Sequence, residues 1–232
     1  MGFALDPEAV ARFERYAAQL VVWNARVNLT RITRPDEIAL QHFLDSLVCL
    51  RALPPGADAP EAALACIDVG TGAGLPGLAL KIVRPAWRLT LVEAVGKKVA
   101  FLEHVVGTLG LVDVTIRHAR AEDLGRDPAH RERYDLAVAR AVAPLATLAE
   151  YLLPFVRPAG RMVAQKGEVV LGELAAAGPA IALLGGHLLE TLRYEIPGLA
   201  HARHLVVVEK VQPTPAAYPR RAGLPAREPL AG

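Results

Sequence analysis

The fold of this chain is decided by the stretch at residues 68–77, DVGTGAGLPG. An apolar run that ends in Asp68 precedes its glycines, and an apolar segment with helical spacing starts near Pro76. A strand, a glycine-rich turn and a helix in this order are typical of the first unit of a parallel sheet. Glycines there let the backbone turn tightly and let a ligand approach without clashes from Cβ atoms. The stretch therefore predicts a ligand site at the end of a strand.

The same alternation continues on the C-terminal side. We expect strands at 64–69, 88–93, 113–118, 134–139, 161–165, about 188–195 and 203–210. Helices near 76–83, 96–109, 144–156 and 168–184 fill the gaps. The pattern predicts an α/β fold with a doubly wound, mostly parallel seven-stranded sheet. Only a turn at Ile196-Pro197-Gly198 separates the last two strands, which predicts a hairpin and an antiparallel terminal strand.

An N-terminal helical cap precedes this sheet. Asp6-Pro7-Glu8 favours a helix start, and apolar residues continue at helical spacing to about Trp23. A second helix is expected from Pro35, with its inner face formed by Ile38, His42, Leu44 or Asp45, and Val48. We divide the chain into a cap at 1–60, a main domain at 61–211, and a proline-rich tail at 212–232 that we expect to be extended and unpacked.

Composition excludes several classes of protein. The 232 residues are 53% hydrophobic, which excludes a disordered chain, and no apolar run reaches the ~20 residues of a membrane span. The first residues lack the pattern of a signal peptide, and Cys49 and Cys66 read as buried free thiols, so we expect a soluble cytoplasmic protein. The net charge is +2, but residues 1–66 hold six basic and eight acidic side chains, and residues 67–165 hold thirteen and ten. A local basic rim remains compatible with an RNA partner.

Two cofactors fit the glycine-rich turn. Gly72, Gly74 and Gly77 match the dinucleotide pattern G-x-G-x-x-G, but in that pattern the first glycine follows the strand at once so that the pyrophosphate reaches the helix N-terminus. An acid followed by G-x-G-x-G instead suits S-adenosylmethionine (AdoMet), which has an ammonium group and no phosphate. A second acid, Glu93, ends the next strand, where it can accept hydrogen bonds from ribose hydroxyls. These features favour AdoMet over NAD, and over a turn without a ligand.

Motifs along most of the chain resemble those of one family, the bacterial 16S rRNA guanine-N7 methyltransferases (RsmG, also called glucose-inhibited division protein B). The motifs that carry the resemblance are, in chain order, WNARVNLT (23–30), HFLDS (42–46), DVGTGAGLPG (68–77), EAVGKK (93–98), RAE (120–122), VARA (138–141), QKG (165–167), RHL (203–205) and YPRRAG (218–223). Each is weak alone, but together and in order they are specific.

The resemblance implies a class I AdoMet-methyltransferase sheet and methyl transfer to N7 of a guanine in the decoding-centre loop of 16S rRNA. We expect a monomer that acts on 16S rRNA or the small ribosomal subunit, without DNA, membrane or metal. The residues expected at the cofactor are Asp68, Gly70, Gly72, Gly74, Leu75, Glu93, Ala121, Glu122 and Arg140. Arg140 is also expected to orient the substrate. We expect no general base, because guanine N7 carries a lone pair and no proton.

Further polar residues are candidates for contact with the RNA. They are Asn28, His42, Asp45, Lys97, Lys98, Lys166, Arg203 and Arg220. His42 and Asp45 lie three positions apart on one helix, so they could instead pair with each other, and Asn28 could make loop bonds only. Two other functions stay open at this point: methyl transfer to a small molecule or protein, and a cofactor- or RNA-binding module without catalysis.

Overall fold

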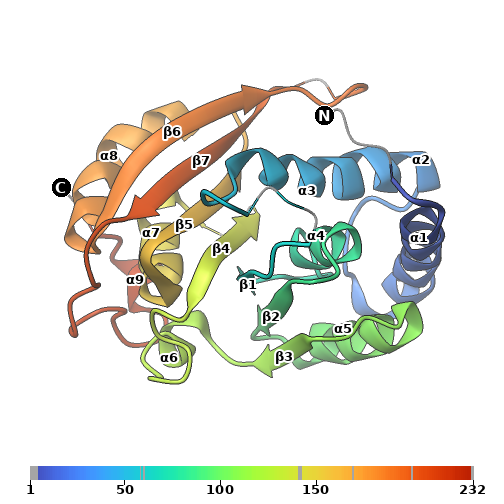
Figure 1. The fold of residues 1–232 in the computed structure, drawn as a ribbon, viewed down its shortest axis with the longest axis horizontal. Coiled ribbons are helices and arrows are strands. Elements are labelled where there is room, and N and C mark those ends of the chain that lie inside the picture. Colours follow the sequence, from blue (N-terminus) through green and yellow to red (C-terminus); the bar gives the residue numbers. More distant parts are fainter. Residues whose placement is uncertain are drawn as a thin grey trace.

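Seven strands form one sheet in the computed structural model, which describes residues 5–57, 59, 61–140, 143–168, 170–199 and 201–230. The strand order is β3-β2-β1-β4-β5-β7-β6 (Figure 1). The bounds are β1 Ala65–Val69, β2 Arg88–Glu93, β3 Val114–His118, β4 Tyr134–Arg140, β5 Val156–Lys166, β6 Gly186–Tyr194 and β7 Arg203–Lys210. Neighbouring strands from β3 to β5 pair in parallel, whereas β7 runs antiparallel to both β5 and β6. The predicted sheet and its antiparallel terminal strand are confirmed.

One strand begins earlier than expected. The helix predicted at 144–156 is α7, Leu145–Leu152, followed by a single 3-10 turn η3, Leu153–Phe155, and then by β5. Pro154 has no N–H for the helical ladder, so the helix ends before it. The remaining helices after β1 are α4 Gly77–Val83, α5 Gly96–Leu109, α6 Ala121–Leu124, α8 Val170–Leu183 and α9 Leu224–Arg227.

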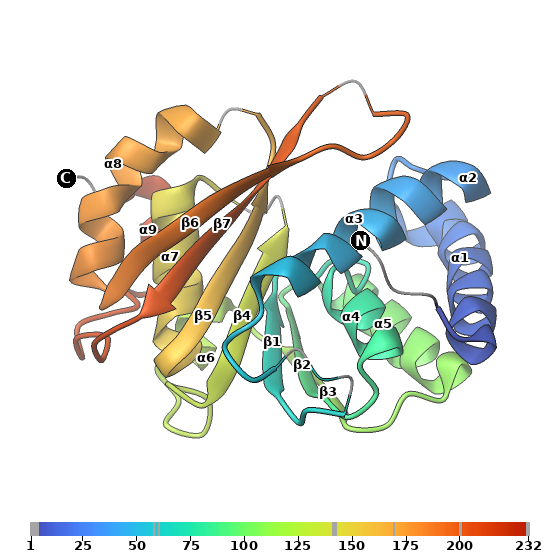
Figure 2. The same cartoon turned by 45° about the horizontal axis from the view of Figure 1, so that its top comes forward.

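Helices cover both faces of the sheet (Figure 2). Alternate residues of each strand point to opposite faces, so Cys66 joins one buried cluster and Ile67 the other. The first cluster contains side chains of the N-terminal helices, α4 and α5, and the second contains side chains of α7 and α8. Both Cys49 and Cys66 are free and buried. None of the helices in the described part of the chain has the length and apolar character needed to cross a bilayer.

The first helix, α1 (Pro7–Val27), begins and ends with caps. Asp6 Oδ1 accepts a hydrogen bond from the N–H of Ala9 at 2.7 Å. The helix runs past the expected end at Trp23, because the left-handed residue that stops it is Asn28, with φ 51°. Trp23 is half-buried and packs edge-on against Phe101 of α5, with ring centroids 5.7 Å apart.

The second helical segment contains a wide turn at its centre. It consists of α2 Pro35–Glu37, the π-helical η1 Ile38–Leu44, α3 Asp45–Leu47 and the 3-10 turn η2 Val48–Ala52. Its buried face contains Ile38, His42, Asp45 and Val48, whereas Leu44 is half-buried. Of the two alternatives for this face, Asp45 is therefore the inward residue.

The C-terminal tail has little regular structure, but it packs against the domain, which differs from the expectation. Arg131 reaches its backbone carbonyls at Thr214 and Tyr218, over 2.6 and 2.7 Å. Thr214 and Pro225 are buried. Proline-rich backbone keeps its carbonyl acceptors even where it lacks N–H donors, so arginine side chains can hold it without regular secondary structure.

Candidate functional site

The glycine-rich turn is held by Asp68, a buried acid next to the end of β1. Its Oδ2 accepts hydrogen bonds from Thr71 Oγ1 at 2.6 Å and from the N–H of Gly77 at 2.8 Å. Burial raises the pKa of Asp68 to about 6, against these hydrogen bonds, which lower it. Asp68 thus ties both ends of the turn together. Asp68 is expected at the cofactor from the sequence, but its side chain is fully buried beneath the turn.

Three glycines of the turn have left-handed backbone: Gly70 at φ 68°, Gly72 at 60° and Gly74 at 92°. A Cβ on Gly72 would meet only open space, with Gly70 O at 4.0 Å as its nearest neighbour. A Cβ on Gly74 would lie 2.8 Å from the hydroxyl of Tyr16. That hydroxyl donates to the carbonyl of Ala73, so α1 supports the turn from behind.

Two adjoining cavities open at the carboxyl ends of the strands. The polar one has a volume of about 390 Å³ and the apolar one about 140 Å³. Both are lined by Gly70 and Glu93, which therefore mark where they meet. The polar cavity is also lined by Thr30, His42, Gly72, Leu75, Lys98 and Arg140. The apolar cavity is also lined by Val69, Val92, Ala94, Ala121, Glu122 and Tyr151.

Glu93 is oriented by the backbone on both sides. Its Oε2 accepts from the N–H of Gly72 at 2.9 Å, and its Oε1 accepts from the N–H of Val95 at 2.8 Å. Each carboxylate oxygen has a second lone pair, so Glu93 can still accept two hydrogen bonds from a ligand. This arrangement suits an elongated molecule with a flat apolar end, a diol at its centre and a polar tail.

Arg140, at the end of β4, lines the polar cavity from the other side. Its Nη1 donates to Asp45 Oδ2 at 3.2 Å and to the carbonyl of Gln41 at 3.2 Å, and its Nη2 reaches His42 Nδ1 at 3.3 Å. Within the described residues, Nε makes no hydrogen bond, so it remains available to a ligand. Asp45 and Arg140 thus join the cap to the sheet at the cavity.

Asp45 is wholly buried, so it cannot contact RNA as the sequence analysis suggests. Arg203 donates to its Oδ2 at 2.7 Å and the hydroxyl of Tyr194 donates to its Oδ1 at 2.8 Å. Gln165 Nε2 donates to its backbone carbonyl at 2.8 Å. Burial and the neighbouring Asp45 raise the pKa of Tyr194, which keeps its hydroxyl protonated as a donor. Arg203, another expected RNA contact, is thereby engaged within the chain.

His42 does not pair with Asp45. Its Nε2 lies 2.9 Å from Thr30 Oγ1, and burial followed by the charge of Arg140 lowers its pKa to about 4. His42 is therefore a neutral side chain of the cavity wall at physiological pH. Asn28 precedes Leu29 and Thr30 of the cavity lining; it is exposed and forms the C-terminal cap of α1.

The four remaining candidates for RNA contact fall in different places. Lys98 lines the polar cavity, and the preceding residue, Lys97, is exposed at the start of α5. Lys166 is engaged by Glu173 at 2.9 Å and by the carbonyl of Ala143 at 2.9 Å. The structure does not bring Arg220 to either cavity, because its guanidinium is held by Glu150 at 2.7 Å.

Three tyrosines near the site are not among the residues expected from the sequence: Tyr16, Tyr151 and Tyr194. Each is isolated in sequence from the motifs, and each reaches the site region from an element whose position depends on tertiary packing. Thr30, Thr71 and Gln165 lie inside the motifs and could have been found from them.

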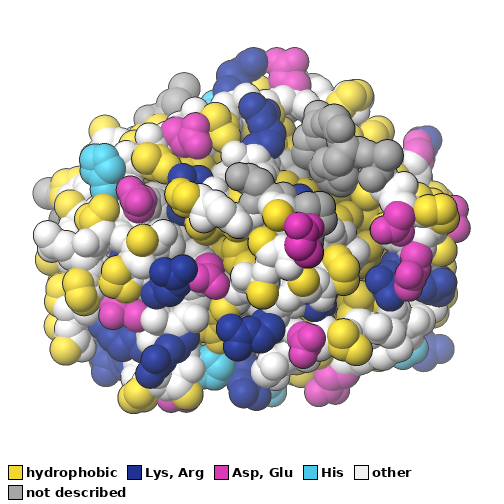
Figure 3. Space-filling view, in the orientation of Figure 1, with side chains coloured by type: hydrophobic (Ala, Val, Ile, Leu, Met, Phe, Trp, Pro, Cys, Tyr) yellow, Lys and Arg dark blue, Asp and Glu magenta, His cyan; other side chains and the backbone are white. Residues whose placement is uncertain are grey.

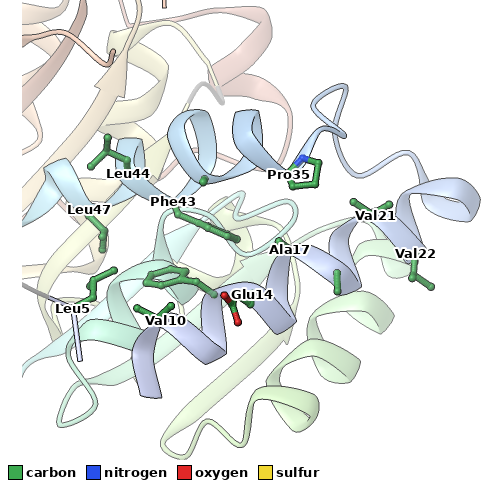
Figure 4. Close-up of a pocket in the computed structure, with 13 residues that line it drawn as sticks. Leu5, Val10, Glu14, Ala17, Val21, Val22, Pro35, Phe43, Leu44 and Leu47 are labelled. Carbon is green, nitrogen blue, oxygen red and sulfur yellow. The ribbon is translucent and has the colours of Figure 1, made fainter. Parts of the chain in front are cut away.

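Another hollow of the described surface lies away from this site. A groove of about 770 Å³ runs between α1 and the second helical segment, lined by apolar side chains such as Val10, Val21, Phe43 and Leu47, with Glu14 as its one acidic residue (Figure 4). It offers no group for chemistry. On the face shown in Figure 3, basic and acidic side chains are interspersed, in line with the small net charge.

Solved structures share this fold. A ribosomal protein L11 methylase from Lactobacillus delbrueckii subsp. bulgaricus superposes with a TM-score of 0.55 at 17% identity, over 74% of this chain and 79% of that one. A geranyl diphosphate methyltransferase in complex with SAM superposes with a TM-score of 0.53 at 14% identity, over 72% and 85%. The fold is that of the class I methyltransferases.

Sequence comparison assigns the chain to one family. The profile of GidB, described as rRNA small subunit methyltransferase G, matches residues 9–206, and the chain belongs to this family. A ribosomal RNA small subunit methyltransferase G of Roseiflexus sp. (strain RS-1) is 54% identical over 99% of this chain and 95% of its own length. The one of Moorella thermoacetica is 49% identical over 99% and 93%. The resemblance inferred from the motifs is confirmed.

Proposed function

We propose that this protein transfers a methyl group from AdoMet to N7 of a guanine in the decoding-centre loop of 16S rRNA. The observation that carries the cofactor assignment is the position of Glu93, shared by an apolar and a polar cavity. AdoMet has the same order of parts: adenine, ribose and a charged amino-acid tail. When bound, it supplies the electrophilic methyl group of its sulfonium.

The residues present fit AdoMet better than a dinucleotide. The N–H of Gly77, at the start of α4, already donates to the buried Asp68. A pyrophosphate would need that helix N-terminus free, and it would meet a carboxylate there instead. We assign Gly70, Glu93, Ala121 and Glu122 to the nucleoside end. Gly72, Leu75 and Arg140 are assigned to the tail, with Asp68 and Gly74 fixing the turn.

The chain's own part in the reaction is to position the base and exclude water. Guanine N7 has an exposed lone pair and no proton to lose, so no side chain has to act as a base. His42 is not placed to act as one, because Arg140 engages its Nδ1 and Thr30 engages its Nε2. N7 and O6 of guanine are adjacent acceptors, and the Nε–H of Arg140, which has no hydrogen bond to the described residues, can donate to O6 or to a phosphate. Holding N7 in line with the methyl group then accounts for most of the rate.

The rRNA substrate follows from family membership, and its finer description belongs to the proposal. A guanine that enters the polar cavity has to be unstacked from its neighbours. Two candidates remain for contact with RNA phosphates: Lys98, which lines that cavity, and the exposed Lys97 next to it in sequence. We further propose that the enzyme acts as a monomer in the cytoplasm.

The test is radiolabelled methyl transfer from AdoMet to 16S rRNA and to 30S particles, both from cells that lack the enzyme. We expect one 7-methylguanine per 16S rRNA, located by primer extension after cleavage at the modified base. Incorporation only into a protein or small molecule would refute the substrate. Calorimetric titration with AdoMet and NADH tests the cofactor separately, and preferential binding of NADH would refute AdoMet.

A further inference from the structure

The C-terminal tail passes behind the apolar cavity, where the proposed function places adenine. Two walls of this cavity come from separate helices: Ala121 and Glu122 of α6, and Tyr151 of α7. The two helices contact each other, but α6 is only one turn long. An element that binds both helices would fix the spacing between the two walls more firmly.

The tail binds the first wall through Glu122. The carboxylate of Glu122 is 2% exposed, and its Oε1 accepts from the backbone N–H of Gly223 at 2.7 Å. Two further contacts fix the end of α6 to the tail. Arg126 Nε donates to the carbonyl of Pro219 at 2.7 Å, and the ring of Pro219 lies so close to Gly125 that a Cβ there would be 3.1 Å from it.

The tail binds the second wall through Glu150, the residue before Tyr151. Glu150 is fully buried and accepts from the backbone N–H of Arg220 at 2.7 Å. The guanidinium of Arg220 adds bonds from Nε at 3.0 Å and Nη2 at 2.7 Å. A fork of this kind compensates a buried carboxylate and fixes its direction as well.

We propose that the segment Arg220–Gly223 braces the apolar cavity by binding both of its walls, so that Arg220 is a positioning residue for the adenine end of the cofactor. The inference rests on the proposed function, because it takes this cavity as the adenine site. The brace would give the YPRRAG motif a role in cofactor binding, although the motif lies far from Glu93 in sequence and outside the lining of both cavities.

Calorimetric titration of the full-length protein with AdoMet, without RNA, tests the proposal. We expect Arg220→Ala to raise the Kd by about tenfold, within the usual range for coupling between sites. Arg221→Ala is the matched control, because its side chain is exposed and makes no hydrogen bond to the described part of the chain. It should bind AdoMet like the wild type. Equal Kd values for Arg220→Ala and the wild type would overturn the proposal.

Hydrogen exchange supplies a readout that a purely structural role would not move. Coupling is reciprocal, so AdoMet should slow exchange at the amides of Arg220 and Gly223 in the wild type. Unchanged exchange at both amides on saturation would refute the brace. If Arg220→Ala is unfolded by circular dichroism, Arg220→Lys replaces it, because lysine keeps the charge beside Glu150 and loses the fork. Failure of the wild type to bind AdoMet would instead refute the proposed cofactor.

Discussion

Arg140 donates a hydrogen bond from Nη2 to Nδ1 of His42 over 3.3 Å. Arginine is always a donor, so Nδ1 must be the acceptor and the proton of the neutral imidazole lies on Nε2. That proton is donated to Thr30 Oγ1 at 2.9 Å, and the same oxygen accepts from the N–H of Ile32 at 3.0 Å. With both lone pairs used, the hydroxyl of Thr30 is left to donate its own proton to a ligand in the polar cavity.

Thr30→Val removes this donor and also the acceptor of the bonds from His42 and Ile32, and we expect methyl transfer to 30S particles to fall by about tenfold or more. Thr30→Ser keeps the hydroxyl and is the matched control. Steady-state rates at varied AdoMet and 30S concentrations would show which substrate the hydroxyl contacts. Equal rates for the valine and serine variants would contradict the donor role.

Arg140→Ala should keep the fold and lose methyl transfer by about a hundredfold or more, since the base is no longer oriented. The fold is retained because Asp45 still has Arg203 and Tyr194 as partners. Arg157→Ala is the control: its ion pair with Asp135 lies near the opposite end of β4. A normal rate in Arg140→Ala with an unchanged melting curve would remove Arg140 from the site.

Asp45→Ala should destabilise the protein by about 3–5 kcal/mol, because two arginines lose a buried counter-charge. Urea denaturation measures this directly. Asp36→Ala breaks the exposed pair with Arg34 and should leave the transition where it is in the wild type. Comparable midpoints for the two variants would show that Asp45 is dispensable to the fold.

The pH dependence of stability should carry the signature of His42. Its pKa is 6.5 in an unfolded chain and about 4 in the folded protein. Between these values the unfolded chain takes up a proton that the folded one does not, so stability falls as the pH drops from 6.5 to 4. The loss attributable to this group is about 3 kcal/mol. Denaturation of His42→Gln over this range should lack that part of the loss.

Asp68 acts in the opposite direction. Burial raises its pKa from 3.8 to about 6, so the folded state binds a proton that the unfolded state does not, and stability rises as the pH falls through 6. Asp68→Asn keeps an oxygen that can accept from Thr71 and Gly77, and removes the titration. Its stability should therefore decline more steeply on acidification than that of the wild type. A shallower decline would mean that Asp68 is not protonated in this range.

The sheet and half of the site could be predicted because they depend on local pattern. Glu93 and Arg140 end their parallel strands and Asp68 is the residue before the end of β1, so strand order alone brings them to one edge. Glycines at 70, 72 and 74 mark the turn by their backbone freedom.

The other half depends on contacts between distant segments. From its place on an amphipathic helix, Asp45 would be predicted to be a surface acid. It is buried because it binds Arg203 and Tyr194, which belong to strands about 150 residues later in the chain. Arg220 likewise looks like a free cation until the buried Glu150 is placed opposite it. The periodicity of the sequence does not indicate which residues pair in this way. The sequence alone therefore cannot predict whether a charged residue such as Asp45 or Arg220 faces solvent, RNA or a buried partner.

The cap and the sheet share one buried cluster, in which Phe13 and Ile38 pack with Leu89 and Val207. This has a consequence for engineering. The N-terminal helices that line the polar cavity also bury one face of the sheet, so a cap taken from another methyltransferase would have to match that buried face. Specificity in this scaffold has to be redesigned from within the cavity, one side chain at a time.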